Sequence, residues 1–250
     1  MGKYSRQFFG KRKHLSRHSA EQIVPWICRA LAPRSVLDVG CGTGTWLSEF
    51  AKHGVTEGLG LDGPWVDTDM LEIPADRFRR ENLEAPFRLG KKFDLVVSLE
   101  VAEHLSPAAA KGFVETLTAH SDVVLFSAAV PEQDGYHHQN EQWPDYWIDL
   151  FAAQGFRMLD VLRPVFWDDE KVAFWYKQNG MIFVSEAMTL GFQMAELAQG
   201  PSFGGKAVVH PEMFLEKQWK SRHQGIIQVL KQVPRALIRS FRYNLGMDQK

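Results

Sequence analysis

The sequence predicts an α/β domain built on a mostly parallel sheet, and three observations lead to this class. A glycine-rich turn at residues 40–44 follows a short apolar strand, further apolar runs recur along the chain, and helical segments lie between them. Five strands that alternate with helices favour a parallel sheet with right-handed crossovers. The length of 250 residues allows one full domain of this class and an appendage.

The composition is that of an ordinary globular chain, with 45% hydrophobic residues and a formal net charge of −1. No apolar run reaches the roughly 18 residues of a membrane span, and the basic N-terminus lacks the apolar core of a secretory signal. The only two cysteines, Cys28 and Cys41, indicate neither a disulfide nor a zinc framework. We therefore expect a cytoplasmic protein.

The N-terminal segment, residues 1–18, carries six Lys or Arg residues and no acid. It is expected to form either a solvated basic arm or a lid that orders over a bound ligand. Ser19 and Gln22 have the spacing of a capping box, which predicts that the first helix begins at Ser19. Pro25 lies in or near its first turn or kinks it, and Pro33 ends the helix.

The segment from Ser35 to Lys52 predicts a strand, a tight turn over residues 40–44 and then a helix. Glycines let the backbone approach a ligand closely, and a helix N-terminus attracts negative charge. The glycines occupy the first, third and fifth positions of the turn, whereas the dinucleotide fingerprint needs the first, third and sixth. No Gly-Lys-Ser/Thr follows, so a Walker loop is excluded as well.

Later strands are expected at residues 58–63, 78–83, 93–100 and 122–128, and a helix opens at Pro107. The strand at 93–100 is a near-continuous apolar run, which is typical of a buried parallel strand. Ligands of open α/β sheets bind at the carboxyl ends of the strands. An acid there, such as the one that closes the strand at 58–63, can accept both hydroxyls of a ribose.

The sequence D-V-G-C-G-T-G at residues 38–44 resembles motif I of the class I S-adenosylmethionine-dependent methyltransferases. The sequence E-V-A-E-H at residues 100–104 resembles the fourth motif of the same family, and the resemblance spans residues 35–184. It implies a Rossmann-like, doubly wound, seven-stranded, mostly parallel sheet whose last strand is antiparallel. It also implies S-adenosyl-L-methionine as the cofactor.

The resemblance assigns roles to individual residues. Asp38 matches the acid that contacts the cofactor's ammonium, and Asp62 matches the acid that holds the ribose. Asn82 stands where the family often has an acid for the adenine amino group, so the charge is missing there. The expected cofactor-binding residues are Asp38, Gly40, Cys41, Gly42, Thr43, Gly44, Trp46, Asp62, Gly63, Asn82, Leu83, Ser98, Leu99 and Glu100.

A polar and aromatic loop over residues 130–143 leads into a helix expected at 144–154. Histidine can take a proton from a hydroxyl near neutral pH. The run H-x-N-E-Q-W-P-x-Y-W from residue 138 resembles a motif of bacterial methyltransferases that are uncharacterised or belong to sugar and natural-product pathways. By that resemblance His138 is the favoured base. The alternative is that His138 and Asn140 only hold the loop in place.

Glu103 and His104 are the other catalytic candidates, because they lie where the next helix begins, at the mouth of the site. The alternative for His104 is a hydrogen bond that braces the loop. No Cys/His/carboxylate spacing completes a metal site, so no metal is expected. The expected substrate-binding residues are His137, Asn140, Glu141, Gln142, Trp143 and Tyr146.

Two further strands are expected at residues 156–162 and 175–184, and residues 186–250 form a partly helical, basic extension to the domain of residues 19–185. Between residues 217 and 250 eight Lys or Arg residues face one acid. This tail is expected to dock on the core, with an anionic membrane surface, self-association or a partner protein as alternatives. Nucleic acid ranks below these, because no recognised binding module is present.

The leading functional hypothesis is O-methylation of a small hydroxylated acceptor, such as a sugar, a polysaccharide terminus or a natural product, with a loop histidine as general base. One alternative is N-methylation of an amine or amino sugar. An alternative from another class is a cofactor-binding partner protein without catalytic turnover. The oligomeric state stays open.

Overall fold

The computed structural model describes residues 6–222, and it describes side chains from His14 onward except that of Phe192. The chain divides into two compact units, residues 1–210 and residues 211–250. The basic tail from residue 223 onward lies outside the described residues, and so do the first five residues of the N-terminal arm. No described helix combines the length and the apolar character needed to cross a membrane.

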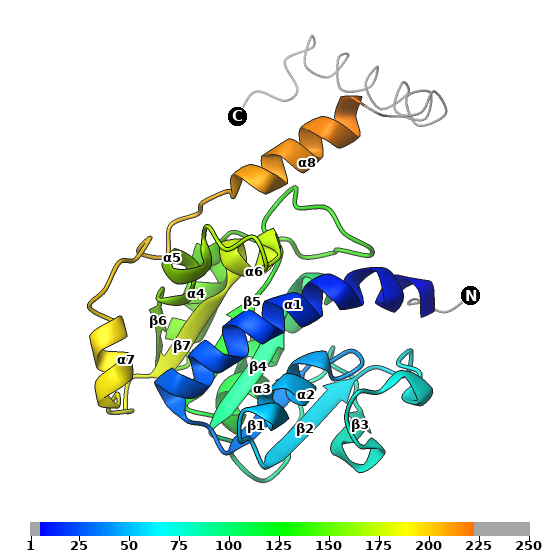
Figure 1. The fold of residues 1–250 in the computed structure, drawn as a ribbon. Helices are drawn as coiled ribbons and strands as arrows, with labels where there is room; N and C mark the ends of the chain where they lie inside the picture. The colour runs from blue at the N-terminus through cyan, green and yellow to red at the C-terminus, as the bar shows by residue number, and fades with distance from the viewer. Residues whose placement is uncertain (1–5, 223–250) are drawn as a thin grey trace. The chain divides into compact units, whose positions relative to one another are not determined.

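The first unit is organised around one seven-stranded sheet with the strand order β3-β2-β1-β4-β5-β7-β6 (Figure 1). Strands β1 to β5 run parallel, and β7 is antiparallel to both of its neighbours, β5 and β6. The expected Rossmann-like sheet with an antiparallel last strand is thereby confirmed. The strands are β1 Ser35–Val39, β2 Glu57–Asp62, β3 Phe78–Arg80, β4 Leu95–Leu99, β5 Val123–Ser127, β6 Phe156–Leu159 and β7 Met181–Ser185.

Helices cover both faces of this sheet, so that two apolar cores form. Figure 1 shows α1 and α2 in front of the sheet and α3 behind it. The helices are α1 Arg6–Leu31, α2 Thr45–Lys52, α3 Ala110–His120, α4 Pro144–Ala152, α5 Leu162–Phe166, α6 Phe174–Asn179 and α7 Phe192–Leu197, with α8 Pro211–Arg222 in the second unit. Four short 3-10 turns are η1 Thr68–Met70, η2 Ala75–Arg77, η3 Ala102–His104 and η4 Pro107–Ala109.

The first helix begins at Arg6, so the expected start at Ser19 is wrong. Ser19 is fully buried inside α1, where its hydroxyl donates to the carbonyl of Leu15 at 2.7 Å and accepts from the Ala173 amide at 3.0 Å. The side chain therefore serves a contact with the segment before α6 instead of a helix N-terminus. Pro25 lies within the helix.

The expected strand over residues 175–184 is correct only in its second half, because residues 174–179 form helix α6. The aromatic residues 174–176 favoured a strand, but they are equally compatible with a short buried helix. Gly180 then ends the helix: its amide donates to the Tyr176 carbonyl at 2.9 Å, and a Cβ would lie 2.6 Å from that oxygen. Only glycine allows this sharp exit into β7.

Candidate functional site

A cavity of about 360 Å³ lies at the carboxyl ends of β1, β2 and β4. The order of the strands reverses between β1 and β4, which is where open α/β sheets bind ligands. Ten of the expected cofactor-binding residues line it: Gly40, Cys41, Gly42, Thr43, Trp46, Asp62, Asn82, Leu83, Leu99 and Glu100. The other four, Asp38, Gly44, Gly63 and Ser98, are not on its wall.

The glycine turn after β1 forms one wall of the cavity, and its backbone requires glycine. Gly40, Gly42 and Gly44 all have positive φ, at 89°, 55° and 83°. A Cβ on Gly40 would stand 2.3 Å from the Val101 side chain. The amide of Gly40 donates to the Leu61 carbonyl at 2.8 Å, which fixes the turn against the end of β2.

Asp62 closes the same corner from the end of β2. Its carboxylate accepts from the amide of Gly42 at 2.7 Å and from the amide of Gly63 at 2.6 Å. Burial raises the pKa of this carboxyl, and the two backbone donors oppose that rise. A carboxylate oxygen has more than one lone pair, so Asp62 can still accept hydrogen bonds from a ligand in the cavity.

Asp38 is buried within β1, and its Oδ2 has no hydrogen-bond partner among the described residues. Burial in the first place, and the charge of Asp62 in the second, raise the pKa of Asp38 to about 8. A buried carboxyl held so far from its ordinary value lacks a compensating positive charge. A cationic group on a bound ligand would supply that charge, so this carboxyl fits the expected cofactor.

The remaining three residues support the cavity from behind. The Ser98 hydroxyl donates to the Val39 carbonyl at 2.9 Å and so ties β4 to β1. A Cβ on Gly44 would lie 2.8 Å from Ile73, and one on Gly63 would lie 2.2 Å from the ring of Trp65. These two glycines therefore allow close packing of the loops that follow β2.

Helix α1 contributes contacts that the local sequence did not predict. Arg17 is ion-paired with Glu72, and Glu72 accepts from the hydroxyl of Thr45 at 2.7 Å. The hydroxyls of Ser16 and Tyr176 are 3.1 Å apart, and both residues line the cavity. The only sequence signal was the basic character of residues 1–18. Other wall residues that were not predicted are Thr45, Trp65, Glu84, Val101, Leu105 and Trp175.

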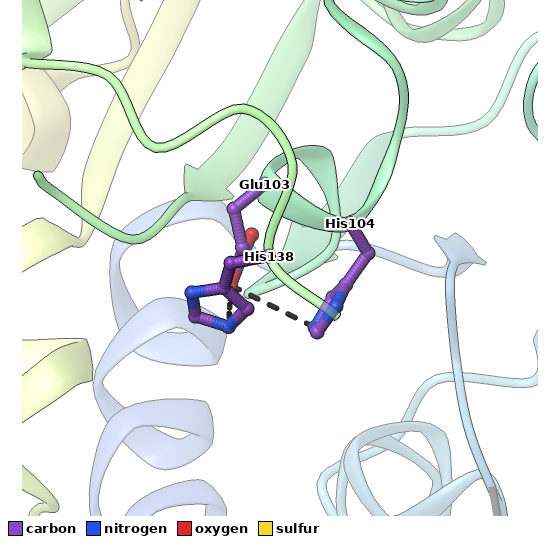
Figure 2. Close-up of side chains that lie close together, drawn as sticks. All are labelled: Glu103, His104 and His138. Carbon is purple, nitrogen blue, oxygen red and sulfur yellow. Dashed lines mark ion pairs between the residues drawn. The ribbon is translucent and has the colours of Figure 1, made fainter. Parts of the chain in front are cut away.

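The three catalytic candidates come together although two of them lie far from the third in the sequence. Figure 2 shows Glu103 and His104 of η3 beside His138 of the loop. His138 Nε2 is 3.9 Å from Glu103 Oε1, and His104 Nε2 is 4.0 Å from the same oxygen. The two imidazole rings meet edge to face, with centroids 4.8 Å apart. His104 lines the cavity, whereas Glu103 and His138 lie behind that wall.

Backbone hydrogen bonds hold the loop of residues 130–143 over this cluster. The amides of Gln139 and Asn140 donate to the Glu103 carbonyl at 2.8 and 3.0 Å. The Gln139 side chain donates to the His104 carbonyl at 2.8 Å. His138 Nδ1 lies 2.7 Å from Glu141 Oε1, and because a carboxylate can only accept, Nδ1 is the donor.

The expected substrate-binding residues belong to this loop, except Tyr146 of α4, and none of them is on the cavity wall. His137 is exposed and has φ 61°, and its ring contacts that of Tyr136. Asn140 is buried, with its side-chain oxygen accepting from Gln142 at 2.8 Å. The other members are Glu141, which holds His138, exposed Trp143, and Tyr146, whose ring packs against that of Trp147.

Glu100 connects the cavity to the loop. It has φ 57°, an uncommon backbone conformation for a residue other than glycine. Its carboxylate accepts from Gln133 at 2.8 Å and from the Asn179 amide at 3.1 Å. Gln133 belongs to the loop after β5 and Asn179 to α6, so one carboxylate joins three segments at the cavity wall.

Comparison with known proteins places this architecture in a family. Residues 12–161 match the family described as "Methyltransferase domain". A dTDP-3-amino-3,4,6-trideoxy-alpha-D-glucopyranose N,N-dimethyltransferase of Streptomyces venezuelae is 33% identical over 137 residues, which is 52% of this chain and 49% of that protein. A ubiquinone biosynthesis O-methyltransferase of Bartonella tribocorum is 32% identical over 77 residues, 28% of this chain and 31% of that protein. The chain thus aligns with half or less of these relatives' lengths.

Solved structures agree on the fold. The sugar N-methyltransferase of a Streptoalloteichus species superimposes with a TM-score of 0.56 at 16% identity, over 72% of this chain and 91% of that one. An amino pentose methyltransferase of Micromonospora echinaspora, solved with S-adenosylmethionine bound, gives a TM-score of 0.53 at 19% identity, over 72% and 97%. Strand order, glycine turn and family match together show that the chain belongs to the methyltransferase-domain family of class I S-adenosylmethionine-dependent enzymes.

Proposed function

We propose that this enzyme methylates a hydroxyl oxygen of a small acceptor, such as a sugar, a polysaccharide terminus or a natural product. The observation that carries the proposal is the Glu103–His104–His138 cluster at the edge of the cofactor cavity. A neutral hydroxyl is a poor nucleophile until its proton is withdrawn, and a histidine cluster is suited to that task.

Three residues are proposed to hold the cofactor. Asp38 pairs with its ammonium, because that buried carboxyl lacks a counter-charge. Asp62 accepts the ribose hydroxyls, and Asn82 offers its side-chain carbonyl to the adenine amino group. When bound, the cofactor supplies a methyl group on a sulfonium, which is an electrophile for in-line displacement. The contribution of the protein to that step is mainly alignment.

His138 is the proposed base. Since its Nδ1 donates to Glu141, its Nε2 carries the lone pair that can receive a proton. His104 stands on the cavity wall in ring contact with His138, so the acceptor hydroxyl is proposed to lie against His104. The substrate candidates of the loop, His137 and Trp143 among them, are proposed to contact the part of the acceptor that extends beyond the cavity.

Helix α1 is proposed to close over the bound cofactor, which is the lid function expected of the N-terminal segment. The pair formed by Arg17 and Glu72, with Glu72 accepting from Thr45, connects α1 to the glycine turn. The contact of Ser16 with Tyr176 connects it to the opposite wall. In the domain division that we propose, residues 1–18 form this lid.

N-methylation of an amino sugar is the second candidate, and one observation favours it. The Streptomyces venezuelae relative, which aligns over 137 residues against 77 for the Bartonella tribocorum relative, is a sugar N,N-dimethyltransferase. An amine needs to be neutral for attack, and a base that accepts its proton would serve both reactions. The acceptor class therefore has to be decided by experiment on matched substrates.

The test offers the purified protein methyl-labelled cofactor together with paired acceptors that differ only in a hydroxyl or an amino group at one carbon. We expect label on the hydroxylated member. His138→Ala should lower kcat by about 10² to 10⁴ and leave binding of the demethylated cofactor unchanged, because the base is lost but the cavity is not. The control is His53→Ala, which changes the C-cap histidine of α2 outside the cavity. Label on the amine alone would favour N-methylation.

A further inference from the structure

We propose that Glu103, His104 and His138 bind a divalent first-row transition metal ion, and that this ion holds the acceptor oxygen. The inference rests on the proposed function and refines it: in the metal-loaded enzyme the Nε2 lone pair of His138 binds the ion instead of taking the proton, and the ion activates the acceptor hydroxyl. Two imidazoles and one carboxylate are a donor set that suits ions such as Zn²⁺, Mn²⁺ or Fe²⁺.

The positions of the donor atoms support the proposal (Figure 2). Each residue offers one atom, and all three lie within 4.8 Å of one another. Glu103 Oε1 is 3.9 Å from His138 Nε2 and 4.0 Å from His104 Nε2. Bonds of about 2.1 Å to one ion place tetrahedral ligands about 3.4 Å apart. Glu103 Oε1 therefore needs to approach each imidazole nitrogen by about half an ångström, and the two imidazole nitrogens need to approach each other by up to about 1.4 Å.

The electron pairs of His138 and Glu103 give a second, independent argument. Because Nδ1 of His138 donates to Glu141, its Nε2 presents a lone pair. The His138 side chain is only 7% exposed, and this Nε2 has no hydrogen-bond partner among the described residues. It faces a carboxylate oxygen across 3.9 Å, which exceeds hydrogen-bond length. Two facing acceptors are stabilised by a cation placed between them.

The surroundings have the form that metal-binding histidines require. A carboxylate that accepts from the second ring nitrogen, as Glu141 does here, fixes the tautomer and orientation of a ligating imidazole. The amides of Gln139 and Asn140 bind the Glu103 carbonyl, so the two segments that carry the ligands are joined without any ion. The ligand positions are therefore set by the fold.

The loop backbone is shaped to deliver this one imidazole. His137, directly before the ligand, has φ 61°. A Cβ on Gly135 would stand 1.9 Å from His138 Nε2, so the ring occupies the space that a side chain at position 135 would fill. Gly135 is consequently a positioning residue for His138.

The chemistry follows from three protein ligands, which leave open positions on the ion. An acceptor hydroxyl bound there has a lowered pKa, so that its proton passes to water. The oxygen then forms its bond to the methyl carbon while the carbon–sulfur bond breaks and its electron pair stays on sulfur. Because His104 also lines the cavity, an oxygen held at this ion lies at the cavity edge.

The test is metal binding by full-length protein that has been treated with a chelator. Titration with Mn²⁺ followed by electron paramagnetic resonance, and with Co²⁺ followed by visible absorption, should each show one bound ion per chain. His138→Ala and Glu103→Gln should abolish this binding, and Glu141→Gln and Gly135→Ala should weaken it about 10- to 100-fold. Binding of S-adenosylhomocysteine by each variant reports that it is folded.

A matched control is the pair formed by Glu49 of α2 and the C-cap residue His53, whose Oε1 and Nε2 atoms are 3.3 Å apart without a third ligand among the described residues. His53→Ala should leave metal binding unchanged. Absence of a stoichiometric ion, or binding that survives in both His138→Ala and Glu103→Gln, overturns the metal site. Hydroxyl methylation that persists without metal would overturn it and leave the proposed function intact. Metal binding without methylation of any hydroxyl acceptor would support the metal site and overturn the proposed function.

Discussion

The glycine turn after β1 and the loop after β5 begin at the same edge of the sheet but are built differently. In the glycine turn every residue with positive φ is a glycine, Gly40, Gly42 and Gly44. In the loop the residues with positive φ are Glu132, Asp134 and His137, which pay a steric cost for that conformation. The turn is thus specified by its own residues, whereas the loop depends on contacts with Glu103 and Glu141 from outside its strained part.

The largest effect is expected from Gly40→Ala, which breaks the turn. Gly40 and Gly54 have nearly the same φ, 89° and 93°, but a Cβ meets Val101 at position 40 and nothing within 4 Å at position 54. Gly54→Ala should cost about 1–2 kcal/mol of unfolding free energy from the left-handed backbone. Gly40→Ala should cost about 1–3 kcal/mol more from overpacking.

Urea unfolding of both variants measures this difference, and calorimetry with S-adenosylhomocysteine measures its functional consequence. Gly40→Ala should also lose cofactor binding, while Gly54→Ala should bind normally. Equal destabilisation of the two variants would mean that packing against Val101 does not define the turn.

The next effect is on cofactor affinity. Asp38→Asn keeps the shape of the side chain and removes its charge. We expect a weakening of about 10- to 100-fold, since a hydrogen bond to a charged partner contributes about 1.5–3 kcal/mol. Isothermal titration with S-adenosylhomocysteine, which retains the ammonium, gives the value. An unchanged dissociation constant would remove Asp38 from the cofactor site.

A pH dependence of stability follows from the same carboxyl. Its folded-state pKa of about 8 exceeds the ordinary value of 3.8, so between these values the native protein holds a proton that the unfolded chain releases. The contribution of Asp38 therefore favours the folded state at low pH and is lost as pH rises toward 8. Ligand-free Asp38→Asn should melt several degrees above the unmodified protein at pH 8, because each pKa unit between the two states is equivalent to about 1.4 kcal/mol, and the gap should close toward pH 4. Parallel melting curves across that range would contradict this.

The smallest effect is expected in the loop, where Asp134→Gly should relieve its positive φ of 64°. The gain is at most about 1 kcal/mol, because glycine also increases the entropy of the unfolded chain. Thermal melting gives the sign of the change in stability. The opposite control is Gly155→Ala, which places a side chain on an existing positive-φ glycine. A loss of stability in Asp134→Gly would mean that the loop carries no relievable strain.

The sheet could be predicted because its strands have recognisable local sequence patterns. The apolar run before Glu100 and the glycine turn gave β4 and β1 to within two residues. The start of α1 and the nature of α6 could not be read, because Ser19 and the aromatic residues 174–176 take their conformations from tertiary contacts. The same physical reason separates the site residues that could be predicted from those that could not. Asp62 was marked by its place at a strand end, whereas Tyr176 lines the cavity, and Glu72 contacts its wall residue Thr45, from segments with no motif.

The position of β7 has a consequence for how the protein is made. This strand is the last of the seven in the sequence, yet it lies between β5 and β6. While the chain leaves the ribosome, β6 has no neighbour to pair with until residues 181–185 emerge, and Tyr176 arrives only just before them. Domains fold as units during synthesis, so the nascent chain acquires its cofactor pocket in one late event. Translation stalled before residue 181 would leave a product that retains an open sheet edge and does not bind the cofactor.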